Sequence, residues 1–391
     1  MILTDTGFSK RDYDRFFVEK LSKAYDVLVL DLAPYLNKKI FNLTLKDQKI
    51  FKYKNYVKVK NFKEFEDFLA KNKKSFSYAF DFISARNKDS FYFKKFLKSI
   101  DIKLVYFQFG LVPNIIRTNK EKILRFLRLL KNPLLFLKKI YSILNTRLRD
   151  RIFQKIKYDY IFISGSKGVD NDYAKKAVKK IFTHSSDYEN TFNYSFSKIN
   201  LNNYFVFLDQ NLPFHPAQFY RGEKPQVTSK KYFPSLAMTF RKIEKKFDSK
   251  IVVAAHPRAD ISDYDNFFKG REIFNSKTID LVKNCNCVLA HTSTAISYAV
   301  IFKKPIIFLT SNEIIKSYDD YRVHSNARIL DAKLLNIDSD NDKYIHSTDF
   351  NLEINDNKYE IFMEKFIKHP MSNEMSIIDN IKINLNWLNY G

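Results

Sequence analysis

Glycine, cysteine and tryptophan are scarce in this chain. Of its 391 residues, 7 are Gly, 2 are Cys and 1 is Trp. The sequence contains neither G-x-G-x-x-G nor a P-loop pattern, which argues against binding of NAD and ATP. The two cysteines, Cys285 and Cys287, lead into the apolar run 287–290, which indicates a buried strand in a reducing compartment rather than a disulfide or a zinc site.

Long hydrophobic runs are also missing. No window of about 18 uncharged apolar residues occurs, and Met1–Asp5 lacks a basic stretch followed by an apolar one. We therefore expect a cytoplasmic protein that does not span a membrane. The hydrophobic share of 45% and the aromatic share of 16% are still enough for large buried cores, and the length predicts about two or three domains.

Acidic residues are outnumbered. The chain has 67 Lys and Arg against 43 Asp and Glu, a formal net charge of +24. Such an excess favours phosphate-rich partners, among them nucleotides, anionic lipids and nucleic acids, and charge alone does not choose between them.

Apolar runs of strand length alternate with amphipathic segments, which predicts parallel α/β sheets. The runs are Asp26–Leu32, Tyr56–Val59, Phe76–Ile83, Ile102–Gly110, Tyr158–Ser164, Tyr204–Asp209, Lys250–Ala255, Cys287–His291 and Pro305–Thr310. A polar, aperiodic stretch at 190–202 separates two sets of runs. We expect an N-terminal domain over 1–195 and a C-terminal domain over 196–391, with the last helix a candidate to pack back on the N-terminal domain.

The segment 120–157 is strongly basic. It holds twelve Lys and Arg against two acids, Glu121 and Asp150, with apolar residues spaced by three and four. This pattern is typical of a helix that lies on an anionic membrane surface, and Pro133 marks the start of a second helix. A solvated helix pair that covers the N-terminal sheet is an equal alternative, and a nucleic-acid groove is the third, without a supporting motif.

Two strand ends in the second half carry polar groups. The run Ile251–Ala255 ends at His256-Pro257-Arg258 (256–258), and the run 287–290 ends at His291-Thr292-Ser293-Thr294 (291–294). Ligands of open α/β sheets bind beyond the carboxyl ends of strands, so His256 is placed to donate a proton or to contact a phosphate. Three successive hydroxyls before a helix favour a phosphate site. A histidine that only caps its strand is the structural alternative.

A third strand end carries a carboxylate. Asp209 follows the first strand of the second half and precedes a polar turn. A carboxylate base and a histidine acid form a working pair for displacing a phosphate-linked leaving group. An aspartate that only caps the turn is the alternative.

The pairing of HPR at 256–258 with HTSTAISYAVIFKKPIIFL at 291–309 resembles bacterial glycosyltransferases that use CMP-activated sugars. These are the sialyltransferases, the legionaminic and pseudaminic acid transferases and the capsule Kdo transferases. The segments GFSKRDYDRF at 7–16 and HSSDYE at 184–189 also look like surface-carbohydrate proteins of this group. The resemblance implies the α/β GT-B fold, with two Rossmann-like doubly wound domains that face a cleft.

The resemblance also implies roles for the strand-end residues. His256, with Pro257 and Arg258, would contact and protonate the nucleotide phosphate, and His291, Thr292, Ser293 and Thr294 would bind the same phosphate. Asp209 would deprotonate the acceptor hydroxyl. The acidic motif usual in the family is absent, and FLDQNLPFHPAQF at 207–219 stands in its place, so Asp5 at the first strand end is a rival base.

The function implied is transfer of a nonulosonic acid from a CMP-sugar to lipopolysaccharide, lipooligosaccharide or capsule, on the inner face of the cytoplasmic membrane. The CMP-sugar is a donor substrate, and we expect no other cofactor, no metal and no nucleic-acid partner. D-x-D spellings occur only in polar loops, at Asp170/Asp172 and Asp263/Asp265 for example. A CDP-polyol phosphotransferase of GT-B fold and a non-enzymatic basic membrane- or nucleic-acid-binding protein are the alternatives.

Overall fold

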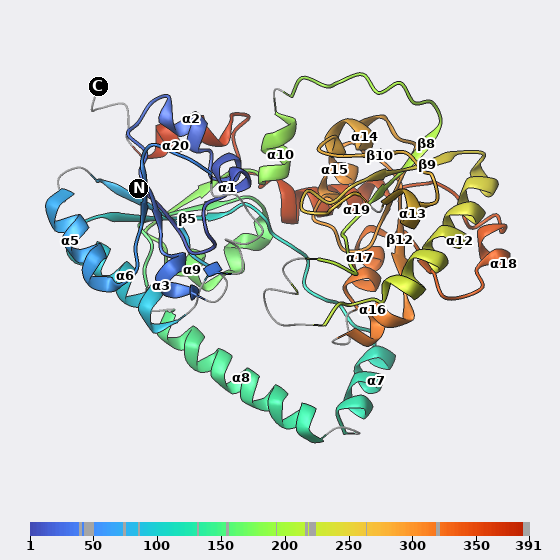
Figure 1. The fold of residues 1–391 in the computed structure, drawn as a ribbon, viewed down its shortest axis with the longest axis horizontal. Coiled ribbons are helices and arrows are strands. Elements are labelled where there is room, and N and C mark those ends of the chain that lie inside the picture. Colours follow the sequence, from blue (N-terminus) through green and yellow to red (C-terminus); the bar gives the residue numbers. More distant parts are fainter. Residues whose placement is uncertain are drawn as a thin grey trace. The chain divides into compact units, whose positions relative to one another are not determined.

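A computed structural model of the chain describes most of its residues. The described residues are 1–38, 41–42, 51–72, 76–84, 87–130, 133–153, 156–192, 194–215, 218, 224–262, 264–317 and 321–385. They form two compact units (Figure 1). The first comprises Met1–Leu111, Asn132–Glu189 and Lys368–Gly391, and the second comprises Val112–Lys131 and Asn190–Ile367.

The first unit is built on a seven-stranded parallel sheet of order β3-β2-β1-β4-β5-β6-β7. Its strands are β1 Ile2–Thr4, β2 Val29–Asp31, β3 Tyr56–Lys58, β4 Tyr78–Phe82, β5 Lys103–Gln108, β6 Tyr160–Ile163 and β7 Lys179–Phe182. Its helices are α1 Lys10–Arg15, α2 Val18–Ser22, α3 Ala33–Leu36, α5 Phe62–Asn72, α6 Lys88–Ser99, α8 Pro133–Phe153, α9 Asp172–Lys176 and α20 Ile377–Asn384. The 3-10 helix η2 spans Ser166–Asp170, and α10, Ser186–Thr191, lies at the boundary of the units.

Apolar cores cover both faces of this sheet. Successive strand residues point to opposite sides, so alternate residues join different cores. Ile2, Val29 and Phe80 join one apolar core with α1, α2 and α20. Their neighbours Leu3, Leu30 and Ala79 join another core with α5 and α6. The last helix, α20, thus packs on the first sheet, beside α2 in the figure (Figure 1).

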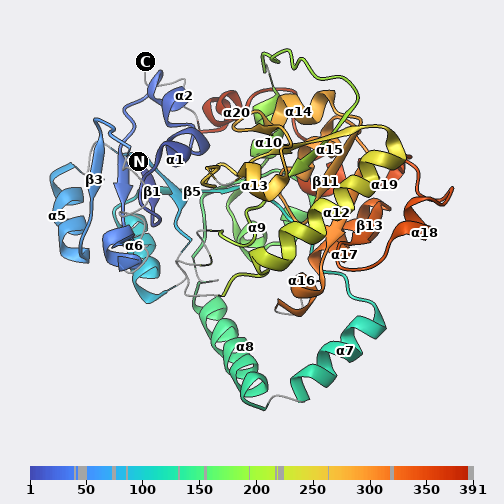
Figure 2. The same cartoon turned by 45° about the vertical axis from the view of Figure 1, so that its right-hand side comes forward.

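The second unit is built on a six-stranded parallel sheet of order β10-β9-β8-β11-β12-β13. Its strands are β8 Tyr204–Leu208, β9 Lys250–Ala254, β10 Ile273–Phe274, β11 Cys287–Ala290, β12 Ile306–Thr310 and β13 Lys333–Asn336. Its helices are α7 Asn119–Leu130, α12 Ser229–Phe247, α13 Tyr264–Phe268, α14 Thr278–Asn284, α15 Ile296–Ile301, α16 Asn312–Lys316, α17 Arg322–Leu330, α18 Asp342–Ile345 and α19 Asp356–Phe362, followed by the π-helix η4 Met363–Ile367. The long helix α12 packs on the sheet, with the rings of Phe240 and Phe207 5.2 Å apart (Figure 2).

The predicted α/β class is confirmed, since each unit has the strand order of a doubly wound Rossmann-like sheet. The expected boundary at 195/196 differs from the observed division in three places. Residues 112–130 lie with the second unit although they precede 133–153 of the first, the described residues of 190–195 also lie with the second unit, and 368–385 lie with the first unit. The basic segment 120–157 is therefore shared between the units. Lys131, Lys155 and the side chains of Arg128, Lys139, Arg149 and Arg151 lie outside the described part.

Candidate functional site

The topological switch point of the second sheet lies at β8, where the strand order turns from β9 and β10 to β11 and β12. Leu208 of β8 is in register with both Ala254 of β9 and Ala290 of β11. The residues that follow these strands, at 209–211, 255–258 and 291–294, therefore meet at one carboxyl edge. His256 and Ser293 therefore share a sheet edge, with β8 between their strands.

His256 is half-buried directly beyond β9. Its Nδ1 accepts a hydrogen bond from the backbone N–H of Arg258 at 3.2 Å. An acceptor at Nδ1 puts the proton of the neutral ring on Nε2. The ring is thus oriented as a donor through Nε2, while Pro257 is exposed and Arg258 half-buried in the same turn.

A second histidine, which the sequence analysis did not select, lies beside His256. The ring centroids of His215 and His256 are 5.0 Å apart, and His215 follows β8 in an irregular loop. Phe214, the preceding residue, is 51% exposed and stacks on Phe267 at 5.7 Å. The signal that could have identified His215 is its own His-Pro spelling, which repeats that of His256; Pro216 lies outside the described residues.

Asp209 is buried at the end of β8, with 6% of its surface exposed. The Tyr264 hydroxyl donates to its Oδ2 at 2.7 Å, and the Asn211 N–H donates to its Oδ1 at 2.9 Å. Burial raises the pKa of this carboxyl, against the opposing effect of Tyr264 and of backbone N–H donors that include His256. Asp209 thereby ties the ends of β8 and β9 to α13.

His291 is enclosed by the protein, with 1% of its surface exposed. Its Nδ1 lies 2.5 Å from the Leu309 carbonyl, to which it donates, and its Nε2 lies 2.8 Å from the Tyr232 hydroxyl. Burial lowers its pKa to about 4, so the ring is neutral at pH 7. Both nitrogens bind protein groups, and we assign His291 to holding the end of β11 in place.

The hydroxyl cluster after β11 is more open than His291. Thr292 and Ser293 are half-buried and Thr294 is exposed. The Thr292 N–H donates to Oε1 of Gln210 at 2.6 Å, which joins the ends of β8 and β11 across the switch point. Oγ of Ser293 accepts from the Ala295 N–H at 3.2 Å, the local turn expected before a helix.

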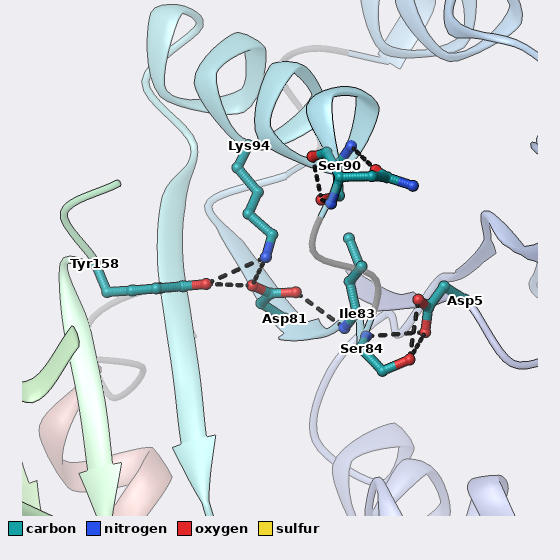
Figure 3. Close-up of polar contacts among 8 residues, drawn as sticks. Asp5, Asp81, Ile83, Ser84, Ser90, Lys94 and Tyr158 are labelled. Carbon is teal, nitrogen blue, oxygen red and sulfur yellow. Dashed lines mark hydrogen bonds and ion pairs between the residues drawn. The ribbon is translucent and has the colours of Figure 1, made fainter. Parts of the chain in front are cut away.

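The first sheet has a switch point of the same kind, between β1 and β4. Asp5 follows β1, its surface is 0% exposed, and its carboxylate faces Ser84 (Figure 3). Its Oδ1 accepts from the Ser84 N–H at 2.9 Å and its Oδ2 accepts from Nδ2 of Asn37 at 3.0 Å. The rival base of the sequence analysis is therefore also a buried, hydrogen-bonded carboxylate at a strand end.

The aspartates of the D-x-D spellings do not converge where the structure describes them. Asp170 ends η2 and pairs with Lys167 at 2.6 Å, while Asp172 begins α9. Asp263 and the side chain of Asp265 lie outside the described residues. Within the described part of the chain, no group of three or more His, Cys, Asp or Glu side chains is arranged to hold a metal ion, and no helix is long and apolar enough to cross a bilayer.

Comparison with known proteins gave matches among solved structures alone. No protein-family model and no curated protein matches the chain. The chain is similar to a UDP-GlcNAc 2-epimerase from Methanocaldococcus jannaschii, at 14% identity, 100% coverage of both chains and a TM-score of 0.48. The chain is also similar to S. aureus MnaA in a structure with UDP, at 13% identity, coverage of 99% of this chain and 97% of that one, and a TM-score of 0.49.

A third similar structure is the wall teichoic acid polymerase TagF, at 11% identity, coverage of 99% of this chain and 89% of that one, and a TM-score of 0.48. Identities and TM-scores this low carry no inference about substrate or reaction. The strand orders within the chain itself carry the fold class: two parallel, doubly wound, Rossmann-like units in one chain are the architecture of the GT-B fold.

Proposed function

We propose that the protein is a glycosyltransferase that transfers a nonulosonic acid from a CMP-activated donor to a bacterial surface glycan. The observation that supports this best is the meeting of His256, Arg258, Ser293 and Thr294 at the switch point of the second sheet. A CMP-sugar carries one phosphate, and a cation, hydroxyls and backbone N–H groups are enough to hold one phosphate without a divalent metal.

In the proposed reaction, the bond between the anomeric carbon and the phosphate oxygen breaks, and CMP leaves. His256 donates from Nε2 to that phosphate, which offsets the negative charge that develops on the leaving group. The acceptor hydroxyl forms the new bond to the anomeric carbon and gives its proton to a carboxylate.

We assign that carboxylate to Asp209, with Asp5 as the competing candidate. Burial raises the pKa of Asp209, which brings its proton affinity closer to that required of a base near neutral pH. The same carboxylate accepts from Tyr264 and from the backbone, so a positioning role is the alternative that an experiment must separate from proton transfer.

The nucleotide preference is tested by thermal shift with CMP, CDP, UMP and UDP. A ligand that binds only the folded state at 100 times its Kd raises stability by about 2.7 kcal/mol. We expect the largest shift with CMP, followed by CMP release from a CMP-sugar when a glycan acceptor is present. A preference for CDP favours polyol-phosphate transfer. Equal, strongly salt-dependent binding of all phosphates and of nucleic acid contradicts an enzyme of either kind.

A further inference from the structure

The helix α7 is attached to the second unit through its charged side. Glu121 is 8% exposed, and its carboxylate accepts from Nη1 and Nη2 of Arg328 on α17 at 3.0 Å each. Arg328 also donates to the Ile116 carbonyl, and Oγ of Ser325 accepts from the Ile116 N–H at 2.9 Å. These contacts bind the segment before α7, and its first turn, to α17.

The first turn of α7 is fixed by a capping box as well. Oγ1 of Thr118 accepts from the Glu121 N–H at 3.2 Å, and Oε2 of Glu121 accepts from the Thr118 N–H at 2.8 Å. Because Glu121 both caps the helix and binds Arg328, the start of the helix and its rotation about its own axis are set by one side chain.

That rotation turns the apolar side of α7 outward. Ile123, Phe126 and Leu130 lie about 140° to 180° around the helix from Glu121. They are 59%, 56% and 54% exposed, and Leu127 beside them is 48% exposed. An amphipathic helix of a globular protein ordinarily buries this side against its own core. In α7 the arrangement is inverted, which leaves a continuous apolar strip for a partner.

Cations border the strip on both sides. Lys120 and Lys122 are exposed and lie about 100° to either side of Glu121. Glu121 is the sole acid in the sequence 119–130, and it is already paired with Arg328. If two copies of the helix met strip to strip, their lysines would face one another without an acid to compensate. An anionic surface, in contrast, offers apolar chains to the strip and phosphates to the lysines.

We propose that α7 binds the surface of an anionic lipid bilayer with its outward strip, and that the Glu121–Arg328 contact holds the strip in that orientation. This inference does not depend on the proposed glycosyl transfer. Helix α8 of the first unit has the same chemistry, with Leu134, Leu137 and Leu144 at least 54% exposed.

The decisive measurement places an environment-sensitive dye on the strip of the full chain. Both native cysteines are buried at 0% exposure, so the F126C variant gives a single reactive thiol. Vesicles of mixed phosphatidylglycerol and phosphatidylcholine should shift its emission to the blue, and 0.5 M salt should reverse the shift. The same dye in K358C, on an exposed site of α19, is the matched control and should not respond.

Charge variants test the electrostatic part by cosedimentation with the same vesicles. Changing Lys120 and Lys122 together to Gln should reduce partitioning by about 5-fold per lysine, equivalent to about 1 kcal/mol each. Changing the exposed pair Lys358 and Lys365 to Gln alters the net charge equally and should leave partitioning within 2-fold. The proposal would be overturned if the dye responded equally to pure phosphatidylcholine vesicles, or if it did not respond to anionic vesicles. A response without lipid that depends on protein concentration would also overturn it, and would identify a second copy of the chain as the partner.

Discussion

His256 and His291 each follow a buried parallel strand, but their rings meet different surroundings. His291 has both nitrogens bound to protein groups and 1% of its surface exposed. His256 is half-buried, and its Nδ1 accepts a hydrogen bond from the backbone N–H of Arg258. The same residue type at the same sheet edge is therefore a packing element in one strand and a candidate proton donor in the other.

The first prediction concerns His256. If it donates to the leaving phosphate, His256→Ala should lower kcat by about 10² to 10⁴ while the fold is retained, because the side chain lies in a turn outside the core. CMP release and circular dichroism measure the two effects. Activity within 2-fold of the wild type in a folded variant would assign His256 to capping its strand.

The second prediction separates the two roles open to Asp209. Asp209→Asn keeps the shape of the side chain but cannot take a proton at neutral pH, so turnover should fall by at least about 10² with CMP affinity retained. Tyr264→Phe removes the 2.7 Å hydrogen bond and leaves the carboxylate in place.

A base role for Asp209 predicts that Tyr264→Phe stays active and that the acidic limb of the pH profile of kcat moves to higher pH, since a donor that lowers the carboxyl pKa is lost. Equal losses in the two variants would identify a positioning role. A near-normal Asp209→Asn together with an inactive Asp5→Asn would transfer the base to the first unit.

The third prediction follows from the pKa of His291, which burial lowers from 6.5 to about 4. Between these values the unfolded chain binds a proton that the folded chain does not, so the free energy of unfolding falls as the pH falls from 6.5 to 4. The loss is on the order of 3 kcal/mol over that window. Urea unfolding at several pH values should show a weaker dependence in His291→Gln, and an unchanged dependence would contradict the prediction.

At the scale of elements, α6 is joined to the first sheet by a buried ion pair (Figure 3). Nζ of Lys94 lies 2.7 Å from Oδ2 of Asp81 on β4, and the Tyr158 hydroxyl donates to the same oxygen at 2.5 Å. The Lys94 and Asp81 side chains are 8% and 1% exposed. Burying both charges costs desolvation free energy. Removing one partner alone is therefore far more destabilising than replacing both partners by uncharged residues.

The fourth prediction uses that asymmetry. Lys94→Met should lower the free energy of unfolding by about 3 to 5 kcal/mol, because the Asp81 charge stays buried without its cation. Adding Asp81→Asn should recover part of the loss. Lys95→Met, at an exposed position of the same helix, should change stability by less than about 0.5 kcal/mol. Similar losses at positions 94 and 95 would indicate that the ion pair does not hold α6.

The elements were predictable where apolar runs are continuous. All nine predicted strand runs contain an observed strand. Central strands buried on both faces leave an uninterrupted apolar signal, whereas the edge strand β3 is half-buried and ends at the exposed Lys58. Short strands gave no such signal: β10 has two residues, and β7 begins with two exposed lysines. The outward strip of α7 was not predictable either, because periodicity identifies an apolar face but not what covers it.

The candidate site also has features that the sequence predicts and features that it does not. Strand-end positions follow from the sequence, so the placement of Asp209, His256 and Ser293 at one sheet edge was predictable, while their roles stay predictions. His215 was not predictable, because its place beside His256, with 5.0 Å between the two ring centroids, depends on an irregular loop. The 2.6 Å hydrogen bond between Gln210 and Thr292 was not predictable either, because it crosses from one strand end to another. Such contacts have no periodic signature in a single chain.

At the scale of the whole molecule, the chain leaves the first unit twice and returns twice. Its last return carries α20. Ile377, Ile378 and Ile381 of this helix, and Leu385 directly after it, join the core formed by β1, β2, β4, β5, β6 and β7. Residues 368–385 are therefore part of the folding unit that contains β1. Damage to α20 should destabilise the first unit and leave the second unit and its candidate nucleotide site intact.

The last prediction tests that independence with two isoleucines of α20. Ile381 is 0% exposed, and Ile381→Ala should lower the stability of the first unit by about 2 to 5 kcal/mol through lost burial and a residual cavity. Ile383 is 53% exposed on the same helix, so Ile383→Ala should cost less than about 0.5 kcal/mol. Hydrogen exchange read by peptide assigns each effect to a unit. For Ile381→Ala we expect faster exchange in β1, β2 and β4, unchanged exchange in β8, β9 and β11, and a CMP-dependent protection of 255–258 equal to that of the wild type. Faster exchange of both sheets to the same extent would show instead that the two units unfold as one.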